Sequence, residues 1–133
     1  MPLIITPFES NLHHIHTTFF VTHPKTGSKH SFEGIIDTGA PCTEFSDVIL
    51  VRAGFIRSVD QEIKIKSGLQ TQKYGKTILP KVKICGQDLN NFEVFVSKLD
   101  ESWGIDALIG LDFFKRFRVT IDYKAGHLVT EPL

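Results

Sequence analysis

The chain has 133 residues, of which 41% are hydrophobic and 23% are charged, and its 15 lysines and arginines balance 15 aspartates and glutamates. This length suits one modest core, and we expect a single domain over residues 1–133. The zero formal net charge gives no electrostatic reason to expect binding to nucleic acid or to a membrane surface. The hydrophobic content excludes a disordered chain.

The two cysteines, Cys42 and Cys85, do not make a disulfide framework, and their spacing fits no zinc-binding pattern. A reducing compartment is the simpler assumption, and we expect a cytoplasmic protein. The segment 1–7 is too short for a signal peptide and is interrupted by proline. No apolar run approaches the roughly 20 residues that span a bilayer, so the chain is expected to be soluble.

The first half of the chain predicts a β-hairpin followed by a short helix. Residues 14–23 are rich in β-branched and aromatic side chains, which favour a strand. A turn signal at 24–28 leads into a second strand at about 30–37. A helix is expected from Ser46 to Gly54, because Ser46 can cap its start and Gly54 can end it.

The second half continues this pattern of short elements. We expect strands at 63–66, 77–84 and 92–96, turns at 67–68 and 86–91, a second short helix at 111–117, and a closing hairpin of 119–123 with 127–130. Many short strands with two short helices are typical of a mainly β fold. The order predicts a closed or folded-over barrel.

Asp37 follows directly after the apolar pair Ile35-Ile36, where a carboxylate is costly unless something uses it. An ordinary turn is the alternative, since Asp-Thr-Gly is a common tripeptide. Thr38 can donate a hydrogen bond that braces the loop, and Gly39 lets the backbone approach a substrate or a partner loop closely. Asp37 is therefore the candidate catalytic residue, with Thr38 and Gly39 as its support.

A second segment, 107–114, is an apolar strand that ends at Gly110 and precedes a helix. Alone it indicates only core packing. Together with Asp37-Thr38-Gly39-Ala40 and Thr43, however, it resembles the paired signatures of the retropepsins, the aspartic peptidases of retroviral type. The stretch 107–123 is most similar to their cellular and bacterial branch, and the whole resemblance covers about residues 32–123.

This resemblance implies a closed retropepsin-like barrel, a hairpin flap and a catalytic site shared between two chains. The sequence holds one Asp-Thr-Gly, so the second aspartate must come from another copy. A twofold dimer would bring the two Asp37 loops together on its axis. The implied activity is that of an aspartic endopeptidase, in which the two aspartates activate a water against a peptide substrate without metal or cofactor.

The resemblance also suggests where the substrate binds. We expect the flap between Lys64 and Lys76, and substrate contacts from Ala40, Gly68, Leu69 and Ile109. Viral members usually carry a carboxylate and an arginine at the places of Pro41 and Leu111, and this chain has neither. The chain therefore lacks the pair of residues on which viral-type contacts to the substrate backbone depend.

The sequence allows three other interpretations. His14 and His16 share one face of a strand and could bind a metal, but no nearby cysteine or acid completes the set, so no metal site is expected. Cys42 could be a redox-sensitive thiol or a small buried residue. The protein could also be a non-catalytic homodimeric module that uses the same fold to bind peptides, although the intact Asp37 motif favours the enzyme.

Overall fold

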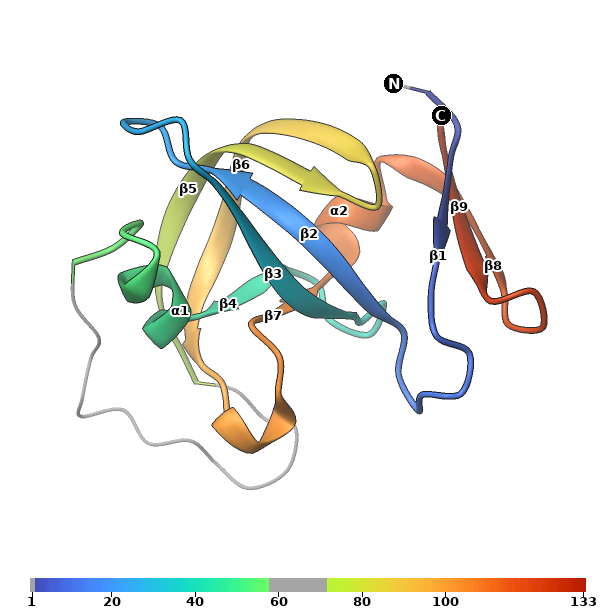
Figure 1. Ribbon diagram of the computed structural model, residues 1–133, viewed down its shortest axis with the longest axis horizontal. Helices are drawn as coiled ribbons and strands as arrows, with labels where there is room; N and C mark the ends of the chain where they lie inside the picture. Colours follow the sequence, from blue (N-terminus) through green and yellow to red (C-terminus); the bar gives the residue numbers. More distant parts are fainter. Residues whose placement is uncertain (1, 58–71) are drawn as a thin grey trace.

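The computed structural model describes residues 2–57 and 72–133. Six strands close into a barrel (Figure 1). In their order around the barrel, these strands are β2 (His16–Thr22), β3 (Lys29–Ile36), β7 (Ala107–Ile109), β4 (Glu44–Ser46), β6 (Gln87–Lys98) and β5 (Gln72–Ile84). The expected mainly β barrel with two short helices is confirmed, and so is the hairpin of β2 with β3.

A separate three-stranded sheet joins the two ends of the chain (Figure 1). It consists of β1 (Ile4–Pro7), β9 (His127–Pro132) and β8 (Phe117–Asp122), with β9 in the middle and antiparallel to both. The buried Gln87 amide fixes this sheet to the barrel, because it donates to Pro2 O at 2.7 Å and to Thr130 Oγ1 at 3.1 Å.

The first helix, α1 (Asp47–Arg52), forms where it was expected. The Ser46 hydroxyl accepts a hydrogen bond from the Ile49 N–H at 3.4 Å, and Gly54 takes φ +84° after the helix. A single 3₁₀ turn, η1 (Glu101–Trp103), precedes β7. No helix among the described residues is long and apolar enough to cross a bilayer.

The second helix is shorter than predicted. It comprises α2 (Leu111–Phe114), and Phe117 already begins β8. The buried Phe117 ring packs 5.0 Å from the Phe113 ring, and from Phe117 onward the side chains alternate between buried and more exposed. The strand period of two therefore replaces the helical period at this residue.

Other sequence predictions also need correction. β6 begins at Gln87, so the turn is confined to Cys85 and Gly86, both at positive φ, and does not extend to residue 91. Strands β1 and β4 were not predicted, because each is very short. The predicted strand at 63–66 and turn at 67–68 lie outside the described residues.

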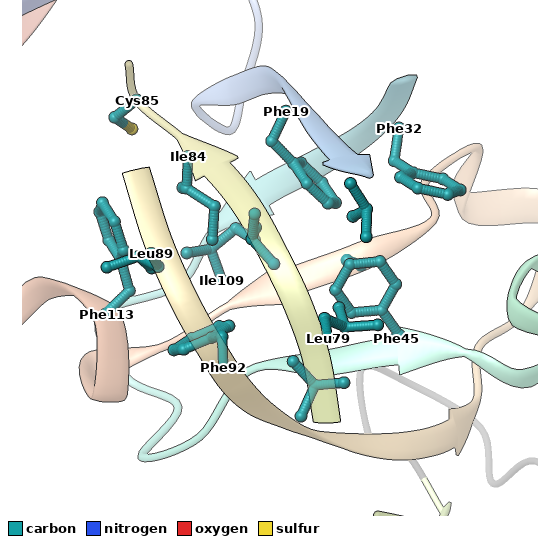
Figure 2. Packing of buried hydrophobic residues seen from close by; sticks show 14 of the residues in the cluster. Phe19, Phe32, Phe45, Leu79, Ile84, Cys85, Leu89, Phe92, Ile109 and Phe113 are labelled. Carbon is teal, nitrogen blue, oxygen red and sulfur yellow. The ribbon is translucent and has the colours of Figure 1, made fainter. Parts of the chain in front are cut away.

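Aromatic and branched aliphatic side chains fill the barrel (Figure 2). Phe19 meets Phe45 edge to face, with ring centroids 5.3 Å apart, and both side chains are completely buried. Each such burial contributes about 1.5–3 kcal/mol to folding. A smaller cluster lies apart from this core and contains Ile35, Leu99, Ile105 and Leu108, with Trp103 packed against it.

Candidate active site

The Asp37 loop starts where β3 leaves its parallel partner β7. Ile36 pairs with Ile109, and the next N–H, that of Asp37, donates to Ile109 O at 2.8 Å. The barrel thus fixes the backbone up to the candidate catalytic residue itself. Asp37 is half-buried, whereas Thr38 and Gly39 after it are exposed.

Hydrogen bonds inside the loop hold the Asp37 carboxylate. The Gly39 N–H donates to Asp37 Oδ1 at 3.1 Å, and the Ala40 N–H donates to Asp37 O at 3.1 Å. A Cβ atom added at Gly39 would lie 3.2 Å from Asp37 Oδ1, which is a tight contact. A glycine at this position lets the backbone reach the carboxylate without crowding it.

Gly110 packs directly beneath the loop. A Cβ atom there would lie 2.7 Å from the carbonyl carbon and oxygen of Cys42 and 2.8 Å from Ala40 O, so these backbone atoms leave no room for a side chain. The following Leu111 N–H donates to Ala40 O at 2.8 Å. The two segments that the sequence singled out are therefore in contact.

Asp112 is a site residue that the sequence reasoning missed. Its Oδ1 accepts from the Thr43 hydroxyl at 2.7 Å, and its Oδ2 accepts from the Thr43 N–H at 2.9 Å. The same hydroxyl accepts from the Gly110 N–H at 3.1 Å. An acid in the first turn of a helix is a common helix-start feature, so no local signal marked its role.

Within one chain, Thr43 takes the bracing role that was expected of Thr38. Thr43 is completely buried, its hydroxyl makes two hydrogen bonds, and its backbone N–H makes a third. Thr38 is exposed, and its hydroxyl has no hydrogen-bond partner among residues 2–57 and 72–133. The link between Thr43 and Asp112 joins the loop to α2 in a chain that lacks the viral pair at positions 41 and 111.

The residues expected to contact substrate differ in how deeply they are buried. Ala40 is half-buried beside Asp37, with both backbone groups used in hydrogen bonds. Ile109 lies among core side chains (Figure 2) and is completely buried, so it does not reach the surface. Its neighbour Leu108 belongs instead to the smaller cluster with Ile35. Strand alternation could have made this distinction from the sequence.

The remaining flap residues are only partly described. Gly68 and Leu69 lie outside the described residues, as does most of the segment from Lys64 to Lys76. Gly75 falls in β5, next to a shift in the register of its pairing with β6.

In the described part of the chain, no group of three or more histidine, cysteine or acidic side chains could hold a metal ion. Cys42 is half-buried next to the Asp37 loop. Burial raises the pKa of Cys85 to about 11, although hydrogen bonds with Thr6 and Thr17 act in the opposite direction.

Comparison with known families settles the relationship of this chain. Residues 26–116, which include both the Asp37 loop and Gly110, match the model of the family described as "gag-polyprotein putative aspartyl protease". The chain belongs to the retropepsin-like aspartic protease family. The resemblance read from the two motifs is confirmed.

Curated relatives agree with this assignment. The chain is 34% identical over 103 residues to Protein DDI1 homolog 2 of Mus musculus and of Homo sapiens, and 31% identical over 103 residues to Protein DDI1 homolog 1 of Bos taurus. Each match covers 75% of this chain and 25% of the relative. The chain thus spans about a quarter of the length of these relatives.

Solved structures confirm the retropepsin-like fold. A retropepsin-like aspartic protease from Rickettsia conorii matches with a TM-score of 0.63 and 21% identity over 96% of this chain and 89% of that one. The retroviral protease-like domain of Ddi1 from Leishmania major matches with a TM-score of 0.59 and 20% identity over 92% of this chain and 95% of that one.

Proposed function

We propose that the protein is an aspartic endopeptidase whose two catalytic carboxylates are the Asp37 side chains of two copies of the chain. The observation that supports this most strongly is the Asp37 loop itself. It carries one carboxylate, is braced from beneath by Gly110, Thr43 and Asp112, and leaves Thr38 and Gly39 exposed. In this proposal, each chain contributes half of a two-carboxylate site, and a second copy completes it.

In the proposed mechanism, the two Asp37 carboxylates share one proton, because two adjacent negative charges repel each other. The ionised carboxylate takes a proton from a water, whose oxygen attacks the peptide carbonyl carbon. The protonated carboxyl donates a hydrogen bond to the carbonyl oxygen and stabilises its negative charge. The tetrahedral intermediate then collapses, the C–N bond breaks, and the departing nitrogen receives a proton. No covalent link to the enzyme forms.

The proposed substrates are extended segments of proteins or peptides, which a closed flap would hold by strand-like hydrogen bonds. Cys42 and Cys85 are both free thiols, which fits work in a reducing compartment such as the cytoplasm. Catalysis by Asp37 needs neither metal nor cofactor.

The decisive experiment compares the wild type with Asp37→Asn in cleavage of an unstructured protein between pH 4 and 7. The amide cannot accept the proton from water, so we expect cleavage to disappear while fold and dimer persist. The matched control is Asp88→Asn, because the Asp88 side chain is exposed and lies outside the Asp37 loop. This variant should cleave at the wild-type rate. A statine-type inhibitor should block the wild type.

Cleavage by Asp37→Asn at the wild-type rate, with contaminating proteases excluded, would show that the assignment is wrong. A wild type that binds peptides but never cleaves them would favour the peptide-binding module instead.

A further inference from the structure

The β3 strand has an edge that β7 does not cover. β7 pairs with residues Gly34–Ile36 of β3. Asp106, just before β7, covers the next residue, Glu33. The Glu33 N–H donates to Asp106 Oδ2 at 2.9 Å, and the Glu33 carbonyl accepts from the Asp106 N–H at 2.7 Å. Backbone groups of alternate strand residues point to the same side. The N–H and C=O groups of Ser31 and Lys29 therefore also point away from β2, beyond the end of β7.

A groove lies along this edge. Its volume is ≈ 520 Å³, and it is bounded by residues 29–32 of β3 on one side and by Ile49, Arg52 and Ala53 of the α1 region on the other. Asp106 closes one end, in line with β7. Among the described residues, no backbone hydrogen bond engages Ser31 or Lys29 on this side. The groove thus offers unused backbone donors and acceptors beside an apolar wall.

The charges around the groove favour an acidic occupant. Arg52 is exposed, and no ion pair of the described residues involves it. The His30 ring stacks on the Phe32 ring, with centroids 6.4 Å apart, so it belongs to the apolar side of the groove. Asp106 is the one acid in the lining, and its Oδ2 already accepts from the Glu33 N–H. Lys29 contributes its backbone here, since its ammonium lies over the Phe20 ring, 4.9 Å from the centroid.

We propose that this groove binds an extended peptide in which acidic and apolar residues alternate, by adding it as a strand to the free edge of β3. Its backbone pairs with Ser31 and Lys29, its apolar side chains contact Phe32, Ile49 and Ala53, and its carboxylates pair with Arg52. Strand addition obtains affinity from backbone hydrogen bonds and selectivity from alternate side chains. The site is separate from Asp37 and does not depend on peptidase activity.

Titration of the full chain with an acetylated, amidated hexapeptide of alternating valine and glutamate tests this proposal by amide NMR. We expect shifts at Lys29 and Ser31 and slower hydrogen exchange of their N–H groups. Ser31→Pro removes one donor and places a ring on the edge, while the β2–β3 ladder keeps its bonds because this N–H points away from β2. Binding should weaken at least tenfold in Ser31→Pro and less than twofold in Ser31→Ala.

Charge selectivity gives a second, independent readout. Arg52→Gln should weaken binding of the valine–glutamate hexapeptide at least threefold. It should leave the affinity for a valine–threonine hexapeptide unchanged. Equal binding by Ser31→Pro and Ser31→Ala would overturn the proposal. So would shifts centred on Gly39 and Ala40, which would place the peptide at the candidate active site. If Ser31→Pro does not fold, the test is hydrogen exchange in the wild type saturated with peptide. Unchanged exchange rates of the Lys29 and Ser31 N–H groups would then overturn the proposal.

Discussion

Asp112 accepts both hydrogen bonds that Thr43 donates, one from the hydroxyl at 2.7 Å and one from the backbone N–H at 2.9 Å. The two residues are 69 positions apart, and the contact ties the Asp37 loop to the first turn of α2. Thr43 is completely buried, so no water can replace a partner that is lost. The placement of Asp37 therefore depends on α2 as well as on β3.

Thr43→Val should destabilise the protein by about 1–3 kcal/mol, because the isosteric side chain leaves Asp112 Oδ1 and the Gly110 N–H without their partner. It should also lower kcat/KM, since the loop loses its anchor. Thr43→Ser keeps the hydroxyl and is the matched control. Urea unfolding and peptidase assays measure both effects. Equal unfolding free energies for the two variants would contradict the bracing role.

Activity should depend on protein concentration if the site is shared between two chains. Well below the dissociation constant of the dimer, mass action predicts that a tenfold dilution lowers the rate per subunit about tenfold. Assays over a dilution series, with sedimentation under the same conditions, measure this dependence. A sedimenting monomer with full activity would rule out the shared pair of carboxylates.

The pH profile should be bell-shaped, because activity needs one Asp37 ionised and the other protonated, and the limbs belong to the pair. Aspartic proteases are the established example of such sharing. Ala40 brings no hydroxyl to the loop, so we expect the maximum in mildly acidic solution. Ala40→Ser adds a donor that favours the charged pair, and should move both limbs to lower pH. Activity that stays constant into alkaline solution, or that a chelator abolishes, would refute this mechanism.

Stability should fall between about pH 9 and 11 through Cys85. Burial raises the pKa of this thiol from 9.0 to about 11, so above pH 9 the unfolded chain releases a proton that the folded chain retains. The neutral thiol's contribution is complete below pH 9 and is lost as the pH rises toward 11, by at most about 3 kcal/mol. Denaturant unfolding at pH 8 and 10.5 should show this loss in the wild type and in Cys42→Ala, but not in Cys85→Ala. An identical loss in all three proteins would disprove the assignment.

Sequence patterns predicted the barrel well where they were local. The β-branched run before Pro24 and the Ser46 cap gave the first hairpin and α1, because hairpins and caps depend on residues close in sequence. The end of α2 was placed too late, because the packing of Phe117 against Phe113 overrides helix propensity there. Short strands such as β4 form only because β7 and β6 flank them.

In the candidate site, too, the residues that belong to local motifs could be predicted, and those that depend on distant contacts could not. Asp37 and Gly110 could be found because each belongs to a recognisable motif, and the structure brings the two segments together. Asp112 could not, since its role arises from a contact with Thr43 across the fold. Ile109 was chosen as a substrate contact without regard to strand alternation, and its side chain lies in the core.

The pairing of β1 with β9 joins Ile4 to Thr130, at opposite ends of the sequence (Figure 1). Contacts between distant positions form slowly, because closing a long loop costs entropy before any bond repays it. The hairpins β2–β3, β5–β6 and β8–β9 connect consecutive strands and can form first. During synthesis on the ribosome, β1 emerges before β9, so it has to wait for the strand with which it pairs. We therefore expect its amides to be among the last to gain exchange protection during refolding.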